Sequence, residues 1–405
     1  MISHLERPPR APPGLRRIWA DFGPGYAANG FVGWMFAATA PVAIILAVGT
    51  AGGLKEAELA SWIFGAFFVN GLLTLLLCWL YRQPLAFFWT IPGTVLVGPA
   101  LGHLSFAEVV GAYCATGALM LVLGMTGWVR RAMQALPMPI VMGMVAGVFL
   151  RFGLDLVRAL HADIGIAAPM VAAWLGLGLV PALGRRLPPL IGALIVGVLA
   201  AVLLGRFDAA ALGALEFARP VLQTPAWRAA ALVELVVPLA ITVLAVQNGQ
   251  GFAVLKAAGH EPPVDAITVA CGAGALASAA VGAVSTCLTG PTNAILASSG
   301  QRERQYTAGL CTGVLAVAFG LMAPAFTRLA LAAPKPFIMA LAGLAMLRVL
   351  QAAFVASFRD RHALGALVSF LVTVADLALL NIGAAFWGLV AGFAVSWALE
   401  RGDFR

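Results

Sequence analysis

The chain is a succession of long apolar runs that are separated by short polar or basic gaps. A helix needs about 20 apolar residues to cross the hydrocarbon core of a bilayer. By this length the sequence predicts fourteen membrane segments: 29–50, 57–80, 86–102, 105–127, 133–151, 164–182, 188–205, 229–256, 264–281, 284–300, 305–327, 334–354, 362–380 and 383–399.

Two of these segments are interrupted near their middle. The apolar run 86–94 breaks at Pro92, and the run 285–293 breaks at Pro291. A single Pro or Gly in a membrane helix is usually a tolerated kink. Two breaks at corresponding places in the two halves of a chain instead indicate the substrate site of a transporter.

An internal repeat supports the correspondence. The stretch 137–151 resembles 334–348 at an offset of 197 positions, with two Pro, a Met, a Leu and an Arg in common. The run 41–48 has a weaker echo at 238–246 with the same offset. The repeat holds an odd number of segments, so the second copy enters the membrane from the opposite side. The sequence therefore predicts two inverted seven-segment repeats related by a pseudo-two-fold axis.

The broken segments match the bilayer only if each begins as a strand. Residues 86–90 in extended form followed by a helix over 92–101 span about 31 Å. Extended backbone cannot face lipid with unpaired amides, so we expect the two short strands to pair antiparallel inside the protein. Pro92 and Pro291 suit the first turn of a helix. Two helix N-termini would then offer N–H groups and positive dipole ends to an anion, without any Lys or Arg.

The composition assigns the chain to the integral membrane proteins, because 61% of residues are hydrophobic and only 10% are charged. The net charge of +8 could suit nucleic acid. However, the basic residues lie in the short gaps. In the predicted topology, about twice as many fall on the membrane face that holds the N-terminus as on the opposite face. This distribution predicts cytoplasmic N- and C-termini and no nucleic-acid partner.

Catalytic chemistry is not indicated. The sequence has no Ser/His pair, no His-Glu metal motif and no Gly-rich phosphate loop followed by Lys. Its five cysteines lie in apolar segments without the spacing of metal ligands or of a disulfide framework. We therefore expect neither an enzyme nor a bound metal or cofactor, which leaves a transporter or an anion channel.

The most polar patch inside a predicted segment runs from Gln247 to Gln250. Amides at membrane depth are costly unless they are paired, so these side chains either bond neighbouring helices or face a substrate. Thr39 is a matching small polar group in the first segment. Trp89, just before the first break, belongs either to an interfacial aromatic belt or to the lining of a cavity.

The motifs 88–93, 246–251 and 289–293 resemble those of the benzoate:proton symporter (BenE) family, and the resemblance covers nearly the whole chain. More remotely, the chain is similar to the fourteen-segment fold of nucleobase/ascorbate transporters and of sulfate and bicarbonate anion transporters. The resemblance implies a homodimer in the bacterial inner membrane whose core moves like an elevator against a gate. The implied parts are a tail at 1–28, a core of 29–127 and 207–328, and a gate of 128–206 and 329–405.

The resemblance also implies binding residues for the substrate. Carried over by position, the candidates are Thr39, Trp89, Thr90, Gln247, Gln250, Thr292 and Asn293, and the breaks themselves add Pro92, Gly93, Thr289 and Gly290.

One departure from the related folds favours a carboxylate. Nucleobase transporters of this fold carry acidic residues in the eighth and tenth segments, where this chain has Val246, Gln247, Gly290 and Pro291. A site without acids suits benzoate or a related aromatic carboxylate better than a neutral base. The expected partners are this carboxylate, protons and membrane lipid. A carrier of nucleobases or other organic anions, and an anion channel, are the alternatives.

Proton coupling needs a group that changes its protonation, and ionisable residues within membrane segments are the first candidates. They are Asp376 in a late segment, Glu234 at about 20 Å along the helix from Gln247, and His103 after the first half-helix. For each of them, a helix cap or a loop-anchoring charge is the other interpretation. The carboxyl group of the substrate is a further possible proton carrier.

Overall fold

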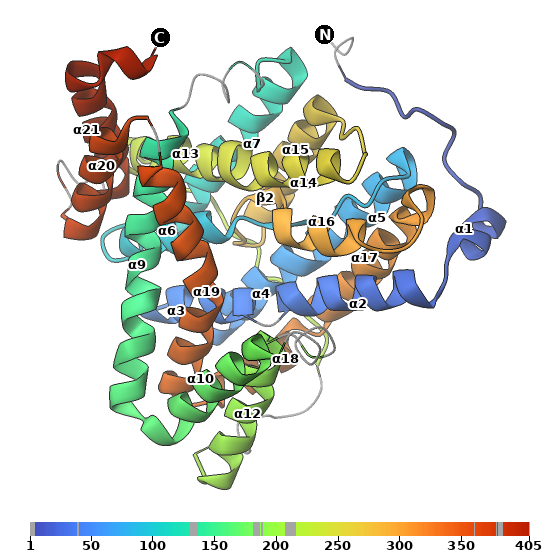
Figure 1. Cartoon of the computed structure of the whole chain (residues 1–405), viewed down its shortest axis with the longest axis horizontal. Helices are drawn as coiled ribbons and strands as arrows, with labels where there is room; N and C mark the ends of the chain where they lie inside the picture. Colours follow the sequence, from blue (N-terminus) through green and yellow to red (C-terminus); the bar gives the residue numbers. More distant parts are fainter. Residues whose placement is uncertain are drawn as a thin grey trace. The chain divides into compact units, whose positions relative to one another are not determined.

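A computed structural model describes residues 5–38, 40–129, 131, 137–180, 187, 189–206, 216–359, 361–377, 379 and 384–404 (Figure 1). Contacts divide the chain into two units. Unit 1 comprises Met1–Ala38, Ala60–Leu136 and Phe217–Ala323, and unit 2 comprises Thr39–Leu59, Pro137–Glu216 and Pro324–Arg405.

Unit 1 holds both breaks and the polar patch. Its elements are α1 (Leu15–Asp21), α2 (Pro24–Ala38), η1 (Gly65–Val69), α5 (Asn70–Tyr81), β1 (Phe87–Trp89), α6 (Ile91–Ala100), α7 (Phe106–Thr126), α13 (Ala229–Ile241), η3 (Thr242–Asn248), α14 (Gly249–Ala257), α15 (Val264–Ala279), β2 (Thr286–Leu288), α16 (Gly290–Ala297), η4 (Arg302–Arg304) and α17 (Tyr306–Leu321). Here η1 and η3 are π-helical, and η4 is a 3₁₀ turn.

Unit 2 is built from apolar helices, of which α9 and α19 lie side by side (Figure 1). Its elements are α3 (Ala40–Ala51), α9 (Met138–Ala162), α10 (Ile164–Leu179), α12 (Pro189–Leu203), α19 (Lys335–Phe358), α20 (Ala363–Ala375), α21 (Ala384–Leu399) and η5 (Arg401–Phe404). One boundary of the units falls inside α4 (Glu56–Phe64), between Leu59 and Ala60, and another falls after Ala323, the first residue of α18 (Ala323–Leu331). Residues 39–59 belong to the predicted core, but the structure groups them with unit 2. The reason is that α3 packs on α19.

The helices confirm a mostly helical protein that crosses the membrane several times. Within the described residues, six helical stretches are long and apolar enough to span a bilayer: Pro24–Ala51, Glu56–Tyr81, Phe106–Thr126, Met138–Ala162, Ala229–Ala257 and Lys335–Phe358. A bent pair, Arg302–Leu321 with Ala323–Leu329, would make a seventh. Shorter apolar helices include α6, α10 and α12. The count of fourteen segments and the inverted repeat stay predictions.

The two short strands form one antiparallel ribbon. Its register pairs Phe87 with Leu288, Phe88 with Cys287 and Trp89 with Thr286. Beyond the strands, the amide of Thr90 donates to the carbonyl of Ser285 at 3.0 Å, and the amide of Thr289 donates to the carbonyl of Ala86 at 3.1 Å. Residues 85–90 and 283–290 are all buried. The ribbon therefore joins segments about 200 residues apart inside unit 1, as the need to pair extended backbone requires.

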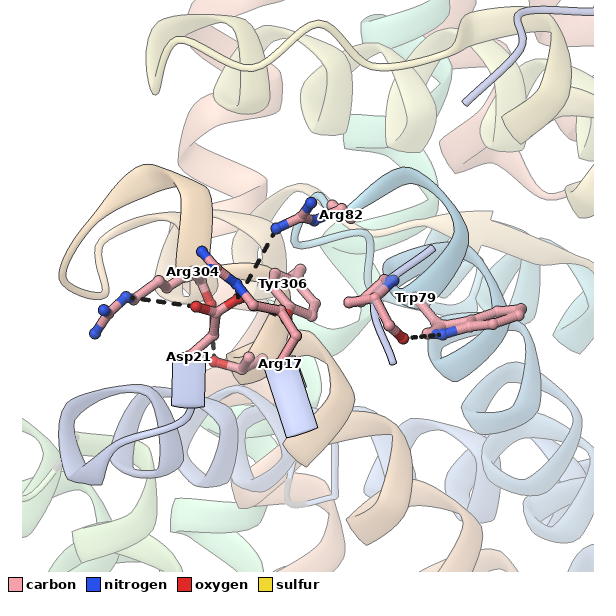
Figure 2. Close-up of polar contacts among 8 residues, drawn as sticks. Arg17, Asp21, Trp79, Arg82, Arg304 and Tyr306 are labelled. Carbon is pink, nitrogen blue, oxygen red and sulfur yellow. Dashed lines mark hydrogen bonds and ion pairs between the residues drawn. The ribbon is translucent and has the colours of Figure 1, made fainter. Parts of the chain in front are cut away.

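A buried carboxylate ties the N-terminal segment to the rest of unit 1 (Figure 2). Asp21, the last residue of α1, is 1% exposed. It accepts hydrogen bonds from Arg17 at 3.0 Å and from the hydroxyl of Tyr306 at 2.9 Å. The guanidinium groups of Arg82 and Arg304 lie 3.9 and 3.7 Å from its oxygens. One side chain thus connects α1 with the end of α5 and with the start of α17.

Residues ahead of α1 add three contacts. The indole N–H of Trp79 donates to the carbonyl of Pro13 at 3.0 Å (Figure 2). The hydroxyl of Tyr81 donates to the carbonyl of Glu6 at 2.8 Å. The carboxylate of Glu6 accepts amides from the first turn of α15, where the helix dipole favours a negative charge. This part of the predicted tail is therefore docked on the helix ends of unit 1.

Replacing Asp21 by Ala should lower the apparent melting temperature of the detergent-purified protein. The change leaves Tyr306 and three arginines without their common acceptor, and the loss of such bonds costs about 1–3 kcal/mol. Asp155→Ala is the matched control. Asp155 forms an ion pair on α9 with Arg158, whose side chain is largely exposed, and such surface pairs contribute about 0–1 kcal/mol. Equal melting temperatures for the two variants would contradict the assigned role of Asp21.

Candidate functional site

Two half-helices start directly after the paired strands. α6 follows β1 and α16 follows β2, each with a proline in its first turn, Pro92 and Pro291. Proline fits there because the missing N–H has no helical acceptor to lose. The N-cap residues are Thr90 and Thr289. The ribbon therefore holds two helix N-termini in fixed places within unit 1.

The two N-caps differ in their hydrogen bonds. The hydroxyl of Thr90 accepts from the amide of Gly93 at 3.1 Å and lies 3.1 Å from the hydroxyl of Thr242. α6 is thus capped by its own sequence. The hydroxyl of Thr289 has no hydrogen-bond partner within the described part of the chain, although the residue is only 6% exposed. α16 therefore keeps an uncapped, positive N-terminus.

The polar patch meets this uncapped end. A Cβ on Gly290 would lie 2.7 Å from the Cβ and 3.1 Å from Oε1 of Gln250, so only glycine permits the contact. Gln250 and Pro291 are exposed, whereas Gln247 is buried. A carboxamide, an unbonded hydroxyl and the first turn of α16 thus lie together on unit 1, and none of these groups is acidic.

The polar patch owes its position to a π-helical turn. Pro238 in α13 cannot donate the helical bond to the residue four positions earlier, Glu234. The π-helix η3 begins at Thr242 and carries Gln247 and Asn248. Such turns widen a helix and occur frequently at functional sites.

Side chains close the outer edges of the ribbon. The hydroxyl of Thr74 accepts from the amide of Phe87 at 2.8 Å, and Asn248 Oδ1 accepts from the amide of Leu288 at 2.7 Å. An unclosed edge would leave amides unsatisfied in a buried setting. Thr74 and Asn248 were not among the predicted site residues. The polar patch was a signal for Asn248, while nothing in the sequence singled out Thr74.

Asn293 also supports the ribbon. Its side-chain oxygen accepts from the amide of Ala86 at 3.0 Å, and its nitrogen donates to the carbonyls of Ala86 at 3.2 Å and Thr289 at 2.5 Å. With its donor and acceptor engaged in this way, the carboxamide extends the ladder past β1 and holds the backbone of the N-cap of α16. Asn293 thus positions the site through the backbone.

Other predicted residues surround the half-helices. Trp89 is 1% exposed, and its ring centroid lies 5.1 Å from that of Phe67. This buried position on the ribbon excludes the interfacial belt as its setting. Thr292 is buried, and a Cβ on Gly33 of α2 would lie 3.2 Å from its Cγ2. Thr39 lies outside the described residues.

The three proton-coupling candidates are found in different settings. His103 Nε2 lies 2.9 Å from Glu234 Oε2, with side chains 23% and 5% exposed. Nothing in the sequence indicated that these two candidates are in contact, and the fold brings them together. Asp376 lies at the end of a helix. α20 ends at Ala375, and Asp376 is its exposed C-cap in a left-handed conformation.

One group of possible metal ligands occurs among the residues that the structure describes: His362, Glu400 and Asp403, with ligand atoms within 4.8 Å of one another. Its carboxylates already serve as helix caps. Glu400 accepts the amides of Leu364 and Gly365 at 2.8 and 3.0 Å, and Asp403 accepts that of His362 at 2.7 Å. Burial disfavours the charge on Glu400, but these amides outweigh it and lower its pKa.

Comparison with known proteins places this architecture in a family. A profile of the family described as "Benzoate membrane transport protein" (BenE) matches residues 20–398. The chain belongs to the BenE family. Members of the BenE family are membrane transporters, so the expectation that the chain is not an enzyme is confirmed.

Two curated relatives match over nearly the whole chain. The inner membrane protein YdcO of Escherichia coli (strain K12) is 31% identical over 90% of this chain and 93% of its own length. The benzoate membrane transport protein of Acinetobacter baylyi (strain ATCC 33305 / BD413 / ADP1) is 26% identical over 96% of this chain and 98% of its own length.

Solved structures share the fold of this BenE-family chain. The transmembrane domain of a cyanobacterial bicarbonate transporter, BicA, superposes with a TM-score of 0.62 at 17% identity, over 94% of this chain and 99% of that domain. The murine Slc26a9 anion transporter in its inward-facing state gives a TM-score of 0.65 at 12% identity, over 98% of this chain and 73% of its own. The predicted resemblance to the BenE family and to a bicarbonate transporter fold is confirmed.

Replacing Asn248 by Ala should destabilise the protein, because the buried amide of Leu288 loses its acceptor at a cost of about 1–3 kcal/mol. The measurement is thermal unfolding of the purified protein in detergent. Asn29→Ala is the control, since Asn29 bonds α16 from a partly exposed position where water can replace it. A smaller shift for Asn248→Ala than for Asn29→Ala would contradict the edge-closing role.

Proposed function

We propose that this BenE-family protein is a secondary transporter that takes up benzoate or a related aromatic carboxylate together with protons. The observation that carries the proposal is the uncapped N-terminus of α16, with the unbonded hydroxyl of Thr289 and the carboxamide of Gln250 beside it. The family description and the name of the Acinetobacter relative point to the same class of substrate.

A carboxylate matches these groups chemically. First-turn amides of a helix lack intrahelical acceptors and lie at the positive end of the dipole. A carboxylate oxygen accepts such amides together with the hydroxyl of Thr289, and the side-chain NH₂ of Gln250 donates to the second oxygen. All three residues of β1 are aromatic, so this strand of the ribbon is apolar. A neutral nucleobase would gain less from a site without acids.

The proposed transport cycle is an elevator-like alternating access. Unit 1 carries both half-helices and the candidate binding residues that are described, so unit 1 is the proposed moving core and unit 2 the proposed gate. The proposal includes fourteen segments in two inverted repeats, a homodimer, and a place in the bacterial inner membrane with both termini cytoplasmic. The name of YdcO, an inner membrane protein, supports the proposed location, and the fold shared with anion transporters supports the proposed transport function.

The test of function combines binding and transport. Benzoate, hypoxanthine and sulfate are titrated into the purified protein by calorimetry, and labelled benzoate uptake is then followed in liposomes under an inward proton gradient. We expect benzoate alone to bind and to accumulate above its level without a gradient. Preference for hypoxanthine or sulfate would overturn the substrate class. Benzoate-dependent conductance without gradient-driven accumulation would indicate an anion channel.

Replacing Thr289 by Val should weaken benzoate binding about tenfold or more. The change preserves shape but removes a donor to a charged oxygen, a bond worth about 1.5–3 kcal/mol. Thr90→Val is the matched control at the corresponding N-cap, where the hydroxyl is already used by Gly93 and Thr242. That variant should lose thermal stability and keep its affinity. Calorimetry on both variants checks this, and an unchanged affinity in Thr289→Val would refute the binding role.

A further inference from the structure

His103 and Glu234 form a partly buried pair of ionisable residues within unit 1. Glu234 lies in α13, inside the spanning stretch Ala229–Ala257, and its side chain is 5% exposed. His103 follows α6 and is 23% exposed, so it keeps contact with the outside of the fold. Their ring nitrogen and carboxylate oxygen are 2.9 Å apart. A buried carboxylate within a membrane span is costly and frequently functional.

The surroundings add little charge to the pair. The elements packed against α13 are α6, α7 and η3. α6 and η3 have no ionisable side chains, and α7 contributes Glu108, Tyr113 and Cys114. Glu108 is bound at 3.2 Å to Arg228, the N-cap residue of α13, so these two charges offset each other. Arg219, on the segment before α13, is exposed.

The pair therefore has two states that differ by one proton. An imidazole and a carboxylate in hydrogen-bond contact hold either one or two protons between them. With one proton the pair carries a negative charge, and with two it is a neutral ion pair. The second of these two states is the one loaded with the proton.

The same two helices connect the pair to the proposed substrate site. At one end, the hydroxyls of Thr90 and Thr242 are 3.1 Å apart, which joins the start of α6 to the π-helix after α13. At the other end, His103, three residues after the end of α6, is joined to α13 by the pair itself. Glu234 and Thr242 are separated by about 12 Å of helix. α6 and the turn after it are thus tied to α13 and η3 at both ends.

We propose that His103 and Glu234 together are the proton-carrying site of the transporter. The inference rests on the proposed function and adds the residues that couple it to protons. His103, the more exposed partner, exchanges the proton with water, and Glu234 stabilises the imidazolium by its negative charge. One proton per cycle offsets the single charge of a carboxylate, so net transport is electroneutral. No bond other than those to the proton forms or breaks.

The test compares Glu234→Gln and His103→Gln with the wild type in proteoliposomes. Two measurements are made, exchange of labelled benzoate at equal concentrations and accumulation driven by an inward proton gradient. We expect both variants to bind and exchange benzoate, and to lose gradient-driven accumulation at least tenfold. The pH dependence of benzoate affinity should become flat in both. Glu108→Gln is the control, because glutamine is accepted in a capping box and the pair is untouched.

The outcomes separate the two proposals. Wild-type protein that neither binds benzoate nor accumulates it would refute the proposed function. If both variants accumulate benzoate as well as the wild type does, the coupling role of the pair is refuted and the proposed function stands. Loss of exchange together with accumulation, in variants with wild-type melting temperatures, would assign the pair to substrate binding or structure and overturn the coupling role. His103→Gln protects the test from misfolding, because the side chain of His103 is partly exposed.

Discussion

The structure of unit 1 depends on one constraint, that extended backbone inside a membrane protein must have its amides paired. β1 and β2 satisfy most of this requirement by pairing with each other, and Thr74, Asn248 and Asn293 satisfy more of it at the edges and ends. The half-helices α6 and α16 start where the strands stop. Their N-termini are therefore placed by the hydrogen bonds of the ribbon.

A threonine caps each half-helix, yet the two ends are chemically different. A hydroxyl that caps its own helix has its acceptor capacity used there. Thr90 does this through Gly93 and is also held by Thr242. Thr289 makes no such bond in the part of the chain that the structure describes. Two similar sequence motifs thus produce one helix end that is capped by its own threonine and one that is not.

Much of the fold followed from local patterns. Hydropathy indicated the membrane class, and the lengths of the broken runs indicated strands that must pair, because both depend on short-range sequence and on bilayer thickness. Burial of single residues was less predictable. Asp376 has apolar neighbours in sequence but lies at an exposed helix end, since α20 stops one residue earlier. Residues 39–59 group with unit 2 because of the packing of α3 on α19, which no local pattern contains.

The amino-acid sequence by itself determined a multi-pass helical membrane protein of the benzoate transport family, with two interrupted segments and a polar patch near the second. Only the tertiary structure decided which groups meet. It brought Gln250 to Gly290, left the hydroxyl of Thr289 unbonded within the described chain, and joined His103 to a glutamate 131 positions away. The physical reason is that insertion of a segment into the membrane depends on its own apolar residues, which the sequence shows directly. The hydrogen-bond partner of a side chain depends instead on how segments far apart in the sequence pack together.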